Sequence, residues 1–344
     1  MNSMKNLYCF LRTLLLVGAS AGTLTPAFAE APQTVTPGNY VRAESDFQMR
    51  GYTEEPYTFG QLFHNREPYD IDNQVTVRGN RDTLYSVGVF DLTSPLTITL
   101  PETEGRYQSL MVVNQDHSLD AAYSPNVITL TEENVGTRYV MLTVRTFMDP
   151  NDAADVAAAH RLQDAVKVEQ ADTGVLDLPN WDQDELEQTR NAINVVASTV
   201  TDTSKMFGRK EDLDPVYWML GAALGWGGLP AEAATYLNFV PEQNDGKIAY
   251  KLTVKDVPVN AFWSVTLYDE QGWMPVNEFN AYSFNSVTAE RAEDGSATIH
   301  FGGDPDQPNF LPIVPGWNYI VRLYQPKEQI LDGSWTFPAP EIVQ

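Results

Sequence analysis

The last third of the chain constrains the fold most, because its residues alternate between apolar and polar with a period of two. Three runs carry this pattern, at Phe262–Asp269, Ala297–Phe301 and Trp317–Tyr324. Turn residues such as Asp294-Gly295 separate the runs. Alternation places successive side chains on opposite faces of a strand. The pattern therefore predicts antiparallel β-strands here rather than helices.

A second β-rich region lies nearer the N-terminus. Its runs are short, rich in β-branched and aromatic residues, and spaced by Gly, Pro, Asn and Asp, which is typical of an antiparallel sandwich. The runs are Val75–Val77, Thr83–Leu92, Leu96–Leu100, Arg106–Asn114, Val127–Leu130 and Tyr139–Thr146.

Between the two β regions the pattern changes to that of helices. An Ala-rich helix is predicted from Asp149-Pro150 to about Val168. Asp182 opens a second helix, with Glu185 three residues later as in a capping box. A third runs over about 215–224 and ends where glycines and proline forbid continuation.

Both β regions resemble known modules. The runs FWSVTLYDEQGW, DGSATIHFGG and NFLPIVPGWNYIVRLYQPKEQILDGSW are similar to the bacterial family known as domain of unknown function 1214. Gly79–Ser86, Asp91-Leu92, Pro101 and Gly105–Tyr107 resemble domain of unknown function 1254. The resemblance implies a mainly β protein of two jelly-roll-like antiparallel β-sandwich modules with an intervening helical segment, and no settled reaction.

The first residues predict export. Lys5 and Arg12 precede an apolar run, Leu14–Ala21, and a small-x-small exit ends at Ala29, as in a secretory signal peptide. Cleavage after Ala29 is expected, which would make the protein periplasmic or secreted. The single cysteine, Cys9, would leave with the signal, so the mature chain would be cysteine-free. The expected division is then 1–29 signal peptide, 30–50 polar leader, 51–148 first sandwich, 149–235 helical segment and 236–344 second sandwich.

Charge narrows the range of partners. The chain has 46 acidic against 22 basic residues and a net charge of −24. Nucleic acid and anionic lipid require clustered Lys and Arg, so neither is an expected partner. No segment after the signal is long and apolar enough for stable membrane insertion. Composition leaves the oligomeric state open.

Familiar catalytic motifs are missing from the sequence. It has no Gly-x-Ser-x-Gly elbow, no His-Glu-x-x-His, no P-loop and no dinucleotide fingerprint. No nucleotide cofactor is therefore expected, and other cofactors are unknown.

Strand parity in the second sandwich groups polar side chains. Trp263, Val265 and Leu267 are predicted to face the core, which leaves Thr266 and Tyr268 on the other face. If all three strands belong to one sheet, that face carries the set Thr266, Tyr268, Thr298, His300, Arg322 and Tyr324. Such a face is either a solvated outer surface or a groove for a sugar or a carboxylate. In the second case Tyr268, His300, Arg322 and Tyr324 bind the ligand.

The first sandwich offers further candidates. Arg81 and Asp82 precede the strand that carries Tyr85. Burial could make Asp82 a general acid or base, and Arg81 and Tyr85 could bind a ligand. The alternative is that Arg81 and Asp82 only anchor the strand through ion pairs and hydrogen bonds.

Asp116-His117 follows the strand that ends at Asn114. An aspartate beside a histidine can orient it, or both can bind a metal. The two can share a site only if they lie in a turn. Neither this pair nor the loop 304–309 has the four ligands of a structural zinc site, so no structural metal is expected.

These observations favour binding of a small polar or glycan-like ligand in a β-sandwich groove. The first alternative is a hydrolase of glycan or amide bonds that uses Asp82, or Asp116 with His117. The second is a structural or assembly protein of the cell envelope.

Overall fold

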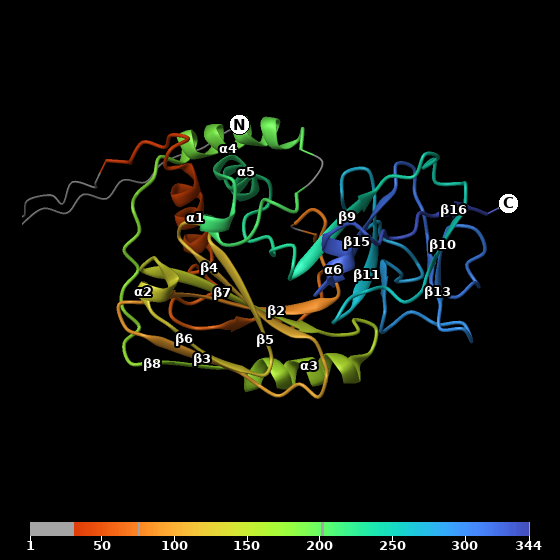
Figure 1. Ribbon diagram of the computed structural model, residues 1–344, viewed down its shortest axis with the longest axis horizontal. Helices are drawn as coiled ribbons and strands as arrows, with labels where there is room; N and C mark the ends of the chain where they lie inside the picture. The colour runs from red at the N-terminus through yellow and green to blue at the C-terminus, as the bar shows by residue number, and fades with distance from the viewer. Residues whose placement is uncertain (1–30, 75, 201–202, 344) are drawn as a thin grey trace, which may run out of the picture.

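The computed structural model describes residues 31–74, 76–200 and 203–343, so the expected signal peptide lies outside the described residues. Two mainly antiparallel β modules lie side by side along the long axis of the molecule (Figure 1). In the first module, a five-stranded sheet of order β1-β2-β7-β4-β5 faces a three-stranded sheet of order β6-β3-β8. The strands are β1 Phe63–His64, β2 Thr83–Asp91, β3 Leu96–Leu100, β4 Gln108–Asn114, β5 Leu119–Tyr123, β6 Asn126–Leu130, β7 Tyr139–Phe147 and β8 Lys167–Gln170.

The second module contains two four-stranded sheets, of order β12-β11-β15-β9 and β14-β13-β10-β16. Its strands are β9 Ala234–Phe239, β10 Tyr250–Val254, β11 Trp263–Tyr268, β12 Ser283–Asn285, β13 Ala297–Phe301, β14 Phe310–Leu311, β15 Asn318–Tyr324 and β16 Glu341–Ile342. Trp263, Val265 and Leu267 do face the core between these sheets, as parity predicts. There they join Trp317 and Phe301, whose rings stack with centroids 4.9 Å apart.

Helices pack on both faces of the five-stranded sheet, with α1 on one side and α3 on the other (Figure 1). Their bounds are α1 Tyr40–Gly51, α2 Glu132–Val135, α3 Ala153–Ala165, α4 Gln183–Ala197, α5 Pro215–Gly225 and α6 Glu328–Leu331. Met49 of α1 packs with Val87 and Val89 on one face, while Ala159 of α3 packs with Leu84 on the other. Asp182 caps α4 by accepting a hydrogen bond from the Glu185 amide, as expected. Across the described ranges, no helix is both long and apolar enough to cross a bilayer.

Two of the expected segments differ in secondary structure from what the sequence predicts. The segment 30–50 is not an unstructured leader, because Tyr40–Gly51 forms α1 and buries Tyr40, Val41 and Met49. The helix looks polar in sequence because it contains Glu44 and Asp46. Both side chains are nevertheless buried, and each has hydrogen-bond partners. The segment 149–235 is not purely helical, because β8 lies within it and pairs with β3.

Two strand predictions also differ from the structure. Residues 76–77 of the predicted strand 75–77 form no strand, and residue 75 lies outside the described part. β5 was not predicted; it is the edge strand that pairs with β4. Its sequence, LDAAY, has two alanines and lacks the β-branched residues that mark a strand.

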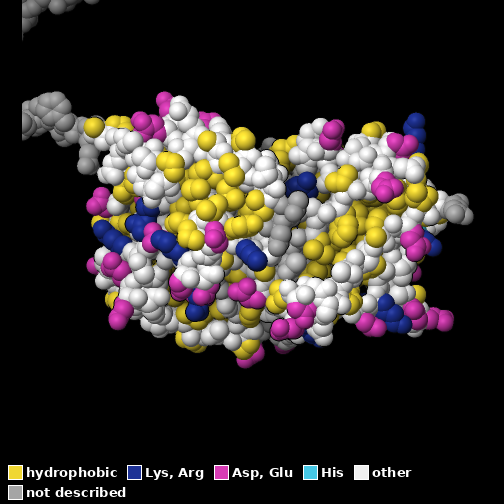
Figure 2. Space-filling view, turned by 45° about the horizontal axis from the view of Figure 1, so that its top comes forward, with side chains coloured by type: hydrophobic (Ala, Val, Ile, Leu, Met, Phe, Trp, Pro, Cys, Tyr) yellow, Lys and Arg dark blue, Asp and Glu magenta, His cyan; other side chains and the backbone are white. Residues whose placement is uncertain are grey.

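The surface charge is dispersed. On the face shown in Figure 2, acidic side chains are scattered, and apolar side chains gather in two patches, one over each half. Basic side chains form no continuous stripe on this face. A concentrated anion-binding surface of the kind that nucleic acid requires is therefore not seen on this side.

Candidate ligand site between the two modules

The polar face of β11 and β15 is buried against the first module. Ser264 pairs with Arg322 across the two strands, so Arg322 shares a face with Tyr268 and Tyr324, as predicted. Arg322 is only 4% exposed and Tyr268 and Tyr324 are at most 1% exposed. The face is therefore neither a solvated surface nor an open groove.

His300 does not belong to this face, so the expectation of one continuous sheet is wrong. β13 pairs with β10, with His300 opposite Lys251, in the sheet on the far side of the core. Strand parity predicts which side chains share a face of one strand, but it does not reveal which sheet the strand joins. His300 is thus separated from Tyr268, Arg322 and Tyr324.

Arg322 connects the two modules through backbone carbonyls. Its guanidinium donates to the carbonyl oxygens of Arg78, at 2.9 Å, and Gly79, at 3.2 Å. It also donates to Thr266 Oγ1, at 2.9 Å, and to the Tyr268 hydroxyl, at 2.7 Å. The Tyr268 hydroxyl donates in turn to the Gly79 carbonyl, at 2.6 Å. These structural bonds occupy Arg322, which leaves it little capacity for a ligand.

Asp82 lies beside this cluster and is 1% exposed. Asn285 donates to its Oδ1 at 3.3 Å, while Oδ2 has no partner among the described residues. Burial raises the pKa of the Asp82 carboxyl, and the positive charge of Arg322 opposes the shift. Arg81, which is 8% exposed, donates to the Tyr69 carbonyl and lies over the Tyr282 ring. The carboxyl has the raised pKa of a general acid but no open path to a substrate.

A different row of side chains crosses the five-stranded sheet on the face toward the second module. Tyr85 on β2 is opposite Arg145 on β7, Arg145 is opposite Ser109 on β4, and Ser109 is opposite Tyr123 on β5. Asn80 bridges this row to the second module, because its side-chain amide donates to the hydroxyls of both Tyr85 and Tyr324, each at 3.1 Å.

Arg145 is the unusual member of this row. It is 8% exposed, and it forms no ion pair with a carboxylate anywhere in the described part of the chain. Its guanidinium carbon lies 5.4 Å from the centre of the Tyr85 ring. The tyrosines that act on its charge are Tyr85, Tyr236, Tyr107 and Tyr324.

The positive charge of Arg145 affects the pKa of the Tyr85 phenol. Burial alone would raise its pKa, but Arg145, together with hydrogen bonds from Asn80 and Thr83, outweighs burial and lowers the pKa below its ordinary value. Sequence reasoning missed Arg145. The available signal was that Arg145 is the one charged residue in the strand Tyr139–Phe147, which is buried along its whole length.

A cavity of about 480 Å³ opens where this row meets the second module. Its walls combine aromatic rings with amides and hydroxyls, contributed by Tyr107, Gln108, Tyr123 and Ser124 from the first module and by Asn260, Phe262 and Gln325 from the second. The Tyr107 ring lies 5.3 Å from that of Phe262, which stacks on Tyr324 at 4.2 Å. Arg106 at its rim is neutralised by Asp155. Among the described residues the cavity wall is therefore polar and has no unpaired cation, while Glu104, which also lines it, forms no ion pair.

Asp116 and His117 lie in a turn, as a shared site requires, but their side chains have different surroundings. Asp116 pairs with Arg42 and with Lys210 at the surface. His117 is fully buried, and its Nε2 accepts a hydrogen bond from the Gly227 amide at 2.9 Å. The structure does not bring the carboxylate and the imidazole together. No three His, Cys, Asp or Glu side chains within the described residues gather in a way that could hold a metal ion.

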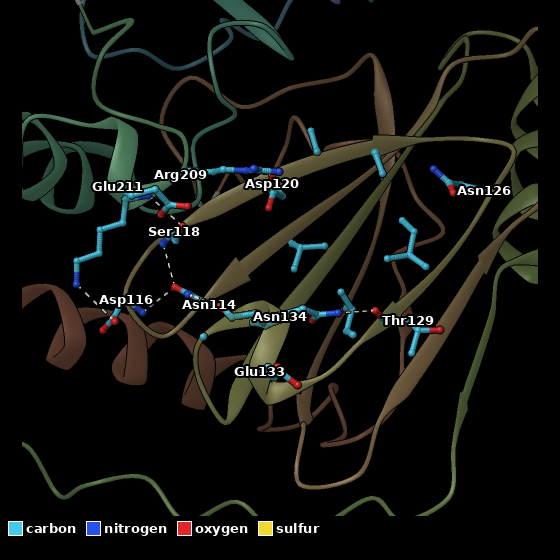
Figure 3. A pocket seen from close by; sticks show the side chains of 18 residues that line it. Asn114, Asp116, Ser118, Asp120, Asn126, Thr129, Glu133, Asn134, Arg209 and Glu211 are labelled. Atoms are coloured by element: carbon cyan, nitrogen blue, oxygen red, sulfur yellow. Dashed lines mark hydrogen bonds and ion pairs between the residues drawn. The ribbon is translucent and has the colours of Figure 1, made fainter.

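Asp116 instead borders a second and larger cavity, of about 700 Å³, at the open side of the first module (Figure 3). β5 and β6 form two of its walls, α2 a third, and residues 209–211 part of its rim.

Comparison with known proteins identifies both modules. The family described as Protein of unknown function (DUF1214) matches residues 235–328, and that described as Protein of unknown function (DUF1254) matches residues 59–127. The chain combines a DUF1254 module with a DUF1214 module. No curated protein matches the sequence. Tyr85, Ser109 and Tyr123 lie within the residues matched by DUF1254 and Arg322 within those matched by DUF1214, whereas Arg145 lies outside both matches.

Two solved structures are similar. The VPA0106 protein from Vibrio parahaemolyticus has 18% sequence identity and a TM-score of 0.68, over 90% of this chain and 98% of that one. An uncharacterized protein from Burkholderia cenocepacia has 13% identity and a TM-score of 0.49, over 89% and 87%. At 18% identity, the similarity to the VPA0106 protein shows a shared fold and nothing further.

Replacing Arg322 by Ala tests its structural role. The change would leave Asp82 without its nearby cation and the Arg78 carbonyl without its donor, so we expect the free energy of unfolding to fall by about 3–5 kcal/mol. Arg42→Ala, which breaks a surface pair, should cost less than about 1 kcal/mol. Urea denaturation measures both. Similar losses in the two variants would contradict the role assigned to Arg322.

His117 should make stability depend on pH. Burial lowers the pKa of His117 to about 3. Between about pH 6.5 and 3 the unfolded chain therefore binds one more proton than the folded chain. As the pH falls through that range, the free energy of unfolding should fall by up to about 1.4 kcal/mol per pH unit. His117→Gln removes the titrating group. Urea denaturation at several pH values should show the two curves converging toward acid pH; parallel curves would refute the assignment.

Proposed function

We propose that this protein binds a small polar ligand that carries a carboxylate, such as an acidic sugar, between its two modules. The carboxylate would pair with Arg145, and the rest of the ligand would occupy the cavity bordered by Tyr107 and Tyr123. The observation that carries the proposal is the nearly buried guanidinium of Arg145, which has no carboxylate partner in the described part of the chain.

A buried cation is costly unless an anion accompanies it. Three partly buried arginines of this chain follow that rule, since Arg106 pairs with Asp155, Arg138 with Asp91 and Arg190 with Glu44. Arg81 and Arg322 form no ion pair among the described residues either, but the charges of Asp70 and Asp82 act on them. Arg145 has tyrosines in place of a carboxylate. A guanidinium binds a carboxylate through two parallel hydrogen bonds, and the surrounding hydroxyls can donate to the same oxygens.

The cavity suits the remainder of such a ligand. Interfaces between modules are common places for small-molecule sites, and a volume of about 480 Å³ is within their usual range. Tyrosine rings can stack on the apolar face of a sugar, and amides can bond its hydroxyls. The row Arg145, Ser109, Tyr123 connects the cation to the cavity wall across neighbouring strands. Arg145 is not itself among the residues that line the cavity, so the carboxylate would have to reach it from the cavity past Ser109.

The arrangement supports binding more than hydrolysis. Asp82 has almost no exposed surface, and Asp116 and His117 have separate partners. A hydrolase that used these carboxyl groups or this imidazole would need them within hydrogen-bond reach of the substrate. Arg145 and the cavity require only that the ligand fit and that its charge be neutralised.

Arg145→Met tests the proposal. Glucuronate should raise the melting temperature of the native protein increasingly as its concentration rises, glucose should raise it less, and Arg145→Met should remove the glucuronate effect. Without ligand, Arg145→Met should be as stable as the native protein or more so, because it replaces an unneutralised buried charge by an apolar chain of similar length. Differential scanning calorimetry with acetate, lactate and glucuronate measures both effects.

Arg209→Met is the matched control, since Arg209 is exposed and the change in net charge is the same. It should leave the carboxylate effect intact. If no carboxylate raises the melting temperature, the proposal fails. If Arg145→Met unfolds the protein as readily as Arg322→Ala, Arg145 is a structural residue instead.

We also propose that the chain is exported, on the strength of the pattern that ends at Ala29. Mass spectrometry of protein purified from its native cells should find Glu30 at the N-terminus. A cytoplasmic protein that begins at Met1 would refute export.

A further inference from the structure

We propose that the groove between β5 and β6 binds an extended basic segment of a partner protein, which adds as a strand to β5. The groove is the cavity of about 700 Å³ shown in Figure 3. β5 is the edge strand of the five-stranded sheet and β6 that of the three-stranded sheet. The proposal is independent of the Arg145 site, which lies toward the second module.

The backbone of β5 has a free edge. The amide of Asn114 donates to the Ser118 carbonyl and that of Ser124 to the Gln108 carbonyl, which fixes the alternation of the β4–β5 ladder. By that alternation, Leu119, Ala121 and Tyr123 direct their backbone groups away from β4. The Leu119 amide donates to the Gly208 carbonyl at 2.9 Å. Ala121 and Tyr123 have no such partner within the described ranges, so they form the open edge.

The opposite wall is already closed to pairing. On β6, the Val127 amide donates to the side chain of Asn126, and the Thr129 carbonyl accepts from the side chain of Asn134. Side chains of this kind protect a sheet edge from a further strand. An incoming strand would therefore pair with β5 and lie along β6.

The charges that line the groove indicate which kind of partner it can bind. Four acidic residues line the groove, Asp116, Asp120, Glu133 and Glu211, against Arg209 and Lys210. Arg209 pairs with Asp120 and Lys210 with Asp116, while Glu133 and Glu211 form no ion pair in the described part of the chain. The unpaired carboxylates favour a cationic partner.

The floor of the groove favours an alternating sequence. Val112, Ala122, Ile128 and Leu130 supply apolar surface between the two walls. A bound strand would direct alternate side chains into this floor and the others toward the acidic rim. A second copy of this chain would instead bring a net charge of −24 against the same rim, which disfavours self-association here.

A labelled peptide that alternates lysine and valine tests the proposal by fluorescence anisotropy with the full chain. We expect saturable binding that weakens as salt rises. A peptide with glutamate in place of lysine should not bind. A lysine–valine peptide methylated on the amides of one edge should bind at least about tenfold more weakly, because methylation removes the donors that pair with β5.

Protein variants locate the binding. Ala121→Pro removes only an outward amide, so the β4–β5 ladder persists, and affinity should fall about tenfold or more relative to Ala121→Val. Glu133→Gln combined with Glu211→Gln should also weaken binding, whereas Glu293→Gln on the second module should not. Arg145→Met should leave peptide affinity unchanged.

Failure of the lysine–valine peptide to bind the native chain overturns the proposal. Equal affinity for the methylated peptide overturns strand addition, even if Ala121→Pro does not fold. If Glu293→Gln weakens binding as much as the groove variants do, the peptide adheres to the acidic surface in general and the groove is not its site.

Discussion

The arrangement of the two modules depends on the guanidinium of Arg322. It extends from the second module to the backbone carbonyls of Arg78 and Gly79 in the first, and the Tyr268 hydroxyl supports the same contact. Carbonyls cannot move without moving the chain, so this contact fixes the position of the loop that leads into β2. The Asp82 carboxyl follows that loop and supplies the opposing charge. A charge buried in this way is tolerated because its hydrogen-bond acceptors and its counter-charge are provided by the fold.

Once the modules are held together, the facing surfaces of their sheets create the candidate site. The row from Tyr85 to Tyr123 lies on the first module, whereas Phe262, Tyr236 and Tyr324 come from the second. Each module alone would present these tyrosines to water. Their juxtaposition surrounds Arg145 with phenols and leaves a cavity at the margin. The ligand site we propose is thus a property of the module pair, which explains why neither module's own strand pattern points to it.

The sequence predicted the local features well and the long-range ones poorly. Alternation correctly placed Trp263 in the core and put Arg322 with Tyr268 on the opposite face, because parity is a property of one strand and its partner. It could not assign His300 to a sheet, nor show that another module covers the Arg322 face, because both depend on contacts distant in sequence. α1 was missed because its buried Asp46 looks like a surface residue until its partners, Trp181 and Gln115, are known.

Arg145 and Arg322 show why residue type alone could not identify the site. Both are arginines on β-strands that face the same module boundary, and both are almost fully buried. The difference lies in their partners: the guanidinium of Arg322 donates to two carbonyls and two hydroxyls beside a carboxylate, whereas that of Arg145 has aromatic neighbours and no carboxylate within the described residues. A satisfied buried charge holds a structure together. A buried charge whose neighbours are phenols and a thioether, like that of Arg145, has no counter-charge among the described residues, and a bound anion would supply one.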